Sequence, residues 1–211
     1  MIRFPINNPM NCRSEIATIC QRTAALTLAA GIWLSPSFAT EAAPEPSSGQ
    51  RPNILLIITD QQHAGMLSAA GNKYLQTPAM DSLARTGTRF ERAYCANPVC
   101  EPSRFSMMTG LMHSTIGLRF NQDAPSNKDA PKLKVPTAIL ERSMGRIFRN
   151  AGYETVYGGK THLPMSIEET GFDYISKDIG MGLADDCVNF IRRKQEKPFL
   201  LVASFINPHD I

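Results

Sequence analysis

The stretch Asn53-Ile54-Leu55-Leu56-Ile57-Ile58-Thr59-Asp60 is an apolar, β-branched run that follows Pro52 and ends in two polar residues. Apolar side chains at consecutive positions indicate a strand that is buried on both faces, as in a parallel sheet. Asp60 falls at the carboxyl end of this strand. The segment therefore predicts an α/β fold that is built on a mostly parallel sheet.

The rest of the chain alternates between helix and strand signals. Helices are predicted over 78–86, from about 102 to 109, over 137–151 and over 184–193, and further strands over 88–94, 155–157 and 199–205. The first of these helices has one apolar face, formed by Met80, Leu83 and Ala84. The third has a predicted inward face, formed by Ile139, Leu140, Met144, Ile147 and Phe148. This order predicts a sheet with helices covering both faces.

The first 39 residues have the pattern of a signal peptide. Three arginines precede the uncharged run Thr23–Leu34, and the small-residue pattern Ser37-Phe38-Ala39 follows it. The run is too short to cross a bilayer, although an N-terminal anchor and a disordered extension remain as alternatives. Residues 40–50 are rich in Ala, Pro, Ser and Glu and predict a linker, so residues 51–211 form the folded part. We expect a periplasmic or secreted protein without a stable membrane span.

Composition and cysteine usage narrow the class of protein. The chain is 43% hydrophobic and 19% charged, which is ordinary for a globular protein. Most of its formal charge of +3 comes from the first 39 residues, so a nucleic-acid-binding surface is not indicated. Three of the five cysteines, Cys95, Cys100 and Cys187, follow that segment, and an odd number leaves at least one unpaired or modified. Whether Cys95 pairs with Cys187 stays open.

Polar residues follow several of the predicted strands. Asp60 ends the first strand, Lys160 and His162 come directly after the strand at 155–157, and His209 follows the strand at 199–205. Sheets of this kind bind ligands beyond the carboxyl ends of their strands. The pattern alone therefore predicts that these four residues converge on one site.

The sharpest motif is Cys100-Glu101-Pro102-Ser103-Arg104, which resembles the signature of the sulfatase family. At average residue usage, a chance match to its four fixed positions is on the order of one in a thousand or rarer. Four further segments are similar to family segments and extend the resemblance over most of 51–211: Arg51 to Gln61, Thr77 to Ala84, Gly159-Lys160-Thr161-His162-Leu163 and Asn207-Pro208-His209.

The resemblance implies that a maturation enzyme oxidises Cys100 to formylglycine. The hydrated aldehyde would attack the sulfur of a sulfate ester with one hydroxyl, and the second hydroxyl would allow sulfate to leave. The resemblance further implies a divalent cation, Ca²⁺ with Mg²⁺ as the alternative, bound by Asp60, Gln61 and the modified Cys100. Gln61 departs from the pair of acids that is common in the family.

The resemblance also gives roles to four other residues. It implies that Arg104 orients the modified residue, that Lys160 neutralises sulfate and nucleophile, and that His162 is the base for the second hydroxyl. His209 would bind sulfate or assist the leaving oxygen. The expected substrate is a sulfated small molecule or carbohydrate. Glu101, at the variable position of the signature, receives no role.

Three functions remain open, because sulfatases are normally much longer and draw further ligands from later segments. The first is a sulfatase that is active only when a further segment completes the site, so that the 211-residue chain alone has no appreciable turnover. The second is a related phosphate or phosphonate ester hydrolase. The third is a truncated, non-catalytic relative in which Cys100 stays a thiol.

Overall fold

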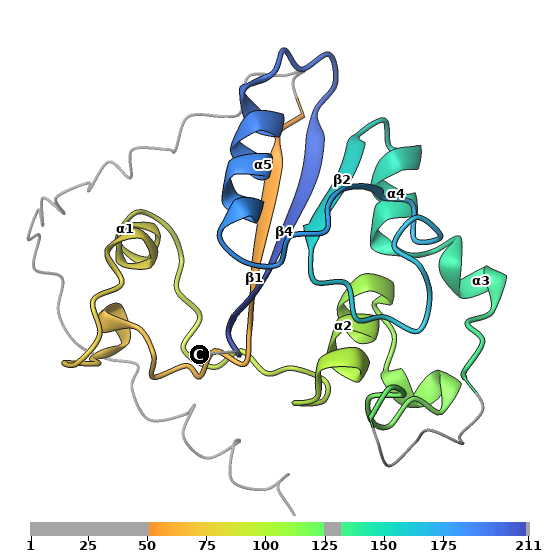
Figure 1. The fold of residues 1–211 in the computed structure, drawn as a ribbon, viewed down its shortest axis with the longest axis horizontal. Coiled ribbons are helices and arrows are strands. Elements are labelled where there is room, and N and C mark those ends of the chain that lie inside the picture. Colours follow the sequence, from red (N-terminus) through yellow and green to blue (C-terminus); the bar gives the residue numbers. More distant parts are fainter. Residues whose placement is uncertain (1–50, 125–131, 210–211) are drawn as a thin grey trace, which may run out of the picture. The chain divides into compact units, whose positions relative to one another are not determined.

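The computed structural model describes residues 51–124 and 132–209 (Figure 1). The predicted leader at 1–39 and linker at 40–50 lie outside these ranges. The described part contains one sheet of four strands in the order β1-β4-β2-β3, and every neighbouring pair is parallel. The strands are β1 (Ile54–Asp60), β2 (Glu154–Gly159), β3 (Asp173–Ser176) and β4 (Phe199–Pro208). The parallel α/β sheet predicted from the sequence is confirmed.

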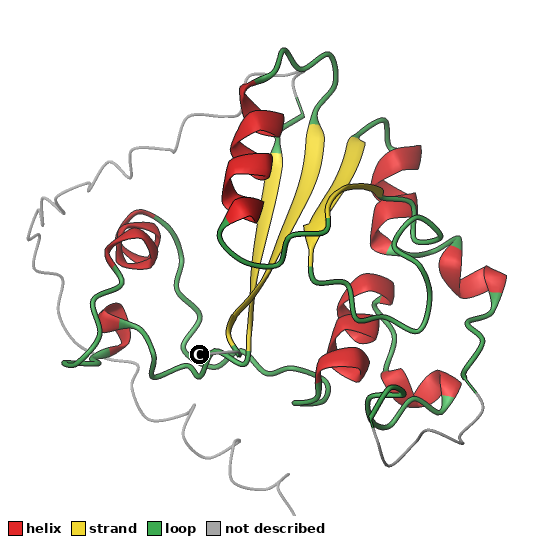
Figure 2. Ribbon diagram, in the orientation of Figure 1, coloured by secondary structure: helices red, strands yellow, loops and turns green. Residues whose placement is uncertain are grey.

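Helices lie on the two faces of this sheet (Figure 2). The helical elements are η1 (Ser68–Ala70), α1 (Pro78–Thr86), α2 (Cys100–Thr109), η2 (His113–Ile116), α3 (Thr137–Leu140), α4 (Met144–Asn150) and α5 (Gly182–Arg192). Helix α5 packs on one face, whereas α2 and α4 contribute side chains to the core on the other face. None of the helices in the described part is long and apolar enough to cross a membrane.

The central strand β4 explains why the sheet is covered on both sides. Phe199, Leu201 and Ala203 pack into the core that includes α5, and the alternate residues Leu200 and Val202 pack into the core on the opposite face. All five side chains are at least 95% buried. Successive side chains of a strand point to opposite faces, so an unbroken apolar run suits a strand that is covered on both.

Strand β1 lies at the edge of the described sheet, and its burial differs from the prediction. Ile54, Leu56 and Ile58 pack into the core shared with α2 and α4. Leu55 and Ile57, on the other face, are 47% and 51% exposed. The prediction that this strand is buried on both faces is therefore wrong for the residues described, because α5 packs over β4, β2 and β3.

The helix predicted over 137–151 is broken into α3 and α4, which serve two different cores. Ile139 and Leu140 of α3 pack with Leu118, whereas Met144 and Phe148 of α4 pack toward the sheet. Ile147, predicted to face inward, is 56% exposed.

The break lies at buried Ser143, whose hydroxyl donates hydrogen bonds to the carbonyl oxygens of Leu140 and Thr170, at 2.6 and 2.9 Å. Gly145 follows, and a Cβ added there would lie 2.4 Å from the Thr170 carbonyl oxygen. This tight packing fixes where α4 starts.

Two other predictions differ from the structure, and one strand was missed. Residues 88–94 form no strand, and Phe90 and Tyr94 are 78% and 88% exposed, because no described strand pairs with this charged segment. Helix α1 forms as predicted but buries no residue, and Leu83 on its apolar face is 66% exposed. Strand β3 went unpredicted because its four residues carry no apolar run.

Candidate functional site

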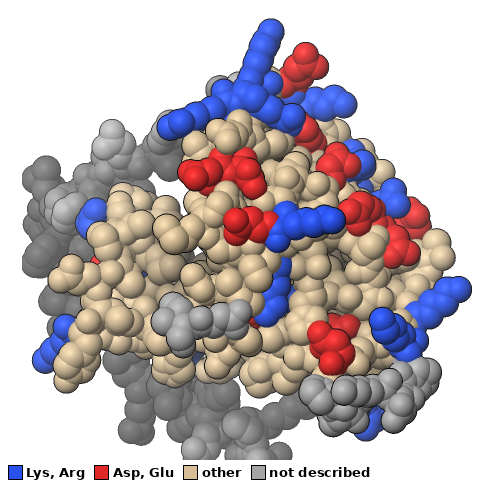
Figure 3. All heavy atoms as spheres, viewed as in Figure 1, with Lys and Arg blue, Asp and Glu red and all other residues tan. Residues whose placement is uncertain are grey.

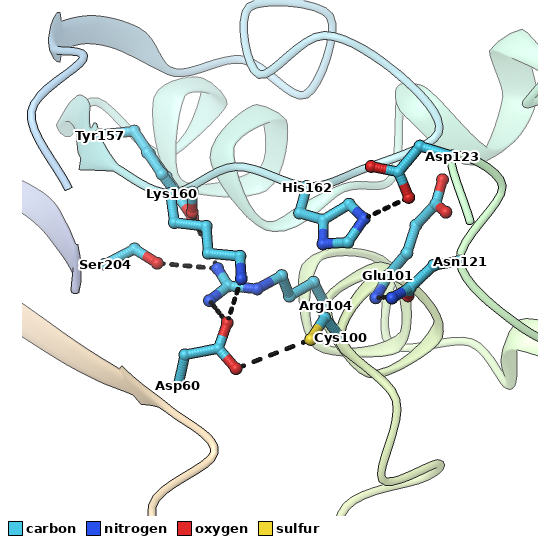
Figure 4. Close-up of polar contacts among 10 residues, drawn as sticks. All are labelled: Asp60, Cys100, Glu101, Arg104, Asn121, Asp123, Tyr157, Lys160, His162 and Ser204. Atoms are coloured by element: carbon cyan, nitrogen blue, oxygen red, sulfur yellow. Dashed lines mark hydrogen bonds and ion pairs between the residues drawn. The ribbon is translucent and has the colours of Figure 1, made fainter. Parts of the chain in front are cut away.

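The carboxyl ends of three strands meet the N-terminus of α2. Ser204 of β4 is in register with Ile58 of β1 on one side and with Gly159 of β2 on the other. The residues that follow these positions therefore reach the same edge of the sheet, where the first residue of α2, Cys100, also lies (Figure 4). This arrangement brings Asp60 and Lys160 together as the sequence predicted.

Asp60 is the centre of the polar contacts at this edge. Its Oδ2 accepts from Lys160 Nζ at 2.8 Å and from Arg104 Nη2 at 3.1 Å, and its Oδ1 accepts from Cys100 Sγ at 3.6 Å. Burial alone would raise the pKa of Asp60, but the hydrogen bonds and charges of Lys160 and Arg104 outweigh it and hold the pKa below its ordinary value. One oxygen of the ionised Asp60 carboxylate thus binds the side chains of Lys160 and Arg104, and the other oxygen faces Cys100.

Arg104 ties α2 to two strands of the sheet. Its side chain is 5% exposed, and Nη1 donates to Ser204 Oγ at 2.7 Å and to the Lys160 carbonyl oxygen at 2.8 Å. Tyr157 donates to the same carbonyl at 2.7 Å. Because Arg104 lies one helical turn after Cys100, these bonds fix the helix turn that carries the cysteine.

Ser204 and Tyr157 were not singled out from the sequence as site residues. Ser204 does leave a signal there, because it interrupts an otherwise apolar strand with a hydroxyl group. That hydroxyl is fully buried and is used by Arg104.

Cys100 opens α2, two residues before the predicted start of the helix near Pro102. Burial, and then the Asp60 carboxylate, raise the pKa of the Cys100 thiol above its ordinary value. The unmodified thiol is therefore a poor source of thiolate at neutral pH. Cys95 is exposed and Cys187 is buried, and both are free, so the two form no disulfide in this structure.

Lys160 owes its position to the glycine before it. Gly159 has a φ of 91°, and a Cβ added there would lie 2.1 Å from the Ser204 carbonyl oxygen. The same carbonyl accepts from the Lys160 backbone N–H at 2.8 Å. Only glycine allows this approach, which directs Lys160 toward Asp60.

His162 and Gln61 share an unusual backbone conformation. Their φ angles are 40° and 59°, in a region that residues other than glycine rarely adopt and that is common at functional sites. His162 Nε2 lies 3.2 Å from Asp123 Oδ1, a partner that the sequence did not reveal. Gln61 is exposed directly beyond the end of β1.

Asp60, Cys100 and His209 form a group that could hold a metal ion, since one ligand atom of each lies within 4.8 Å of the others. His209, which the sequence assigned to substrate, thus reaches the predicted cation site. Oxidation of Cys100 would replace sulfur by oxygen, and together with the Asp60 carboxylate this suits a hard cation such as Ca²⁺. A second such group consists of Glu101, Asp123 and His162.

Comparisons with known proteins point to one family. The family model described as Sulfatase matches residues 52–211. The chain is 30% identical over 178 residues to a Δ4,5-hexuronate-2-O-sulfatase of Bacteroides thetaiotaomicron, with 77% of this chain and 35% of that protein covered.

Two solved structures share the fold. The chain superposes on a 2-O GAG sulfatase with a TM-score of 0.62 and 28% identity, covering 76% of this chain and 36% of that one. A phosphonate monoester hydrolase of Agrobacterium radiobacter gives a TM-score of 0.56 at 22% identity, covering 75% and 41%. The chain thus spans 35% of the curated relative and 36% to 41% of these structures. It belongs to the sulfatase family.

Proposed function

We propose that this chain is the nucleophile-bearing part of an exported enzyme that hydrolyses sulfate esters, with Cys100 converted to formylglycine. One observation carries the proposal: the two ends of the signature, Cys100 and Arg104, both contact Asp60, which also binds Lys160. Three segments that are far apart in sequence thus build one site around the residue to be oxidised.

Residue 100 supplies the reacting group. Its aldehyde, once hydrated, carries two hydroxyls: one attacks sulfur and displaces the alcohol, and the other loses its proton as the aldehyde re-forms and sulfate leaves. The N-terminus of α2 adds partial positive charge beside the sulfate oxygens. An unmodified thiol lacks the second hydroxyl and so has no such route to release.

The neighbouring side chains manage charge and protons. Lys160, whose side chain is 14% exposed, offsets the charge of sulfate and of the nucleophile. His162 takes the proton from the second hydroxyl, and His209 binds sulfate or assists the leaving oxygen. Asp60 and Gln61, with the modified residue 100, would hold a cation, which would supply Lewis-acid stabilisation of developing negative charge.

The substrate that we propose is a sulfated carbohydrate. This rests on the hexuronate sulfatase to which the chain is 30% identical. Because the chain covers 35% of that relative, we assign the activity to a protein of the relative's length. The described residues give the cation few ligands, and Ca²⁺ prefers about six to eight oxygens. We therefore expect weak Ca²⁺ binding and little turnover from the 211-residue chain by itself.

A phosphonate or phosphate ester is the second candidate substrate, because the phosphonate monoester hydrolase shares the fold. Paired assays distinguish the two. The protein is expressed with a maturation enzyme, both as this chain and at the length of its relatives, and is given an aryl sulfate and the matching aryl phosphate. We expect the longer protein to prefer the sulfate.

Cysteine variants serve as controls for this assay. Cys100→Ala should abolish sulfate hydrolysis, and Cys95→Ala, at an exposed free cysteine, should leave it unchanged. Faster phosphate hydrolysis, or activity that survives in Cys100→Ala, would reject the proposal.

A further inference from the structure

The contact between His162 and Asp123 joins a predicted catalytic residue to one that no motif covers. His162 Nε2 lies 3.2 Å from Asp123 Oδ1. In Figure 4 the other ring nitrogen points away from Asp123, to the side on which Lys160 and Cys100 lie. The imidazole thus stands between an aspartate and the reacting residue.

We propose that Asp123 is a positioning residue, which fixes the orientation and the tautomer of His162. A carboxylate accepts hydrogen bonds and does not donate them, so in the neutral imidazole Nε2 must carry the proton that is shared with Asp123. Nδ1 then keeps its lone pair and can accept a proton. This inference rests on the proposed function for its purpose, since a base for the second hydroxyl of residue 100 needs that lone pair.

The loop that carries Asp123 is fastened to the start of α2. The Glu101 backbone N–H donates to Asn121 Oδ1 at 3.0 Å. Gln122 donates from its backbone N–H and from Nε2 to the two Glu101 carboxylate oxygens, at 2.6 and 2.7 Å, and accepts from the Leu133 N–H at 2.5 Å. We refer to these four bonds as the Glu101–Gln122 clasp.

The clasp indicates a structural role for Glu101, which occupies the variable position of the signature. Glu101 is 3% exposed, and both of its carboxylate oxygens are used by Gln122. Because Glu101 follows Cys100 and Gln122 precedes Asp123, the nucleophile and the partner of its base are held in one frame. This explains why a buried carboxylate occupies a position to which sequence reasoning gave no role.

The charge of Asp123 is less important than its oxygen. The Asp123 side chain is 75% exposed, so solvent screens its charge. The His162 side chain is 21% exposed, and its backbone is held in the left-handed region. The Asp123 oxygen, as a hydrogen-bond acceptor at the end of the ring, selects one orientation of the imidazole. Solvent screening of the charge does not remove this preference.

Two-dimensional NMR of the 211-residue chain with ¹⁵N-labelled histidine tests the proposal, because the two ring nitrogens report the tautomer directly. Spectra are recorded at about pH 8.5, which is above the ordinary histidine pKa of about 6.5. The His162 signal is assigned from a His162→Gln sample. We expect the Nε2–H form in the unsubstituted chain, and a tautomer ratio about threefold or more lower in Asp123→Ala.

Two further variants separate the causes. Asp123→Asn keeps an acceptor oxygen and should restore the ratio. Gln122→Ala removes the two side-chain bonds of the clasp and should lower the ratio. Asp173→Ala is the matched control, because it removes an exposed carboxylate that pairs with Arg149 instead. A predominant Nδ1–H form in the unsubstituted chain, or an unchanged ratio in Asp123→Ala, would overturn the proposal. The spectra do not require oxidised Cys100, so failure of the proposed function would leave their result intact.

Discussion

The charged side chains of the site are arranged so that one buried carboxylate pairs with two basic residues. Asp60 and Arg104 have side chains that are 7% and 5% exposed, and Lys160 completes the group. A buried ion pair adds little stability compared with apolar side chains in its place. The loss of one partner, however, leaves the other charge buried without its partner and its hydrogen bonds. The geometry of the site is therefore sensitive to Arg104 in particular.

Replacement of Arg104 by Met should destabilise the fold by about 2–4 kcal/mol, because Asp60 and Ser204 lose a buried donor. Lys160 remains beside Asp60 and limits the loss. Arg149→Met is the control, since Arg149 and Asp173 form a pair whose side chains are 41% and 65% exposed, and should cost under about 1 kcal/mol. Urea unfolding followed by circular dichroism measures both values, and equal losses would contradict this view of Arg104.

Asp81 connects two helical elements at the scale of secondary structure. From α1 its carboxylate accepts from the backbone N–H of Ala69 in η1 at 2.9 Å, from the Ser68 hydroxyl, and from the Thr77 hydroxyl at 2.9 Å. The Ser68 hydrogen bond is the largest cause that holds the pKa of Asp81 below its ordinary value. Since α1 buries no residue, these bonds account for much of the attachment of η1 to α1.

The attachment of η1 to α1 should weaken in acid. A carboxyl whose pKa is lowered by folding stabilises the folded form at pH values above its pKa in the unfolded chain. This stabilisation is lost as the pH falls through its pKa in the folded chain. We expect faster proteolysis within 65–77 near pH 3 than near pH 5, and Asp81→Asn should show the faster cleavage at both. Asp185→Asn, in the first turn of α5, is the control. Cleavage in Asp81→Asn at the unsubstituted rate would contradict the assignment.

The elements differ in how far the sequence could predict them. Strands β1 and β4 begin with apolar runs, β2 contains the short β-forming stretch Thr155-Val156-Tyr157, and the three end near Asp60, Lys160 and His209. Both the strands and the convergence of their ends could therefore be read from the pattern. The break between α3 and α4 could not, because it depends on Ser143 and Gly145 meeting residues 170–172.

The same limit applies to the site. The contact of Asp60 with Lys160 follows from where parallel strands end. The contact of Arg104 with Ser204 depends on the order and register of the strands, and that of His162 with Asp123 joins two residues that lie 39 positions apart in the sequence. Tertiary partners of this kind leave no local signal in the sequence.

At the scale of the whole molecule, the described part combines a covered sheet with surface charges of both signs. On the face in Figure 3, basic and acidic side chains are interspersed. Exposed ion pairs such as Arg149–Asp173 also bring the two signs together at the surface. The face in view therefore carries charged side chains of both signs, and the charged group around Asp60 is largely buried.

We expect residue 100 of this molecule to be formylglycine after maturation, and peptide mass spectrometry detects this change directly. The protein is made in a host that has a maturation enzyme, digested, and the peptide spanning Cys100 is weighed; Arg104→Ala serves as a variant that such an enzyme should convert poorly. We expect the unsubstituted peptide to have the mass in which –CH₂–SH has become –CHO. A peptide that carries only the unmodified thiol, from a host that oxidises another sulfatase in parallel, would contradict it.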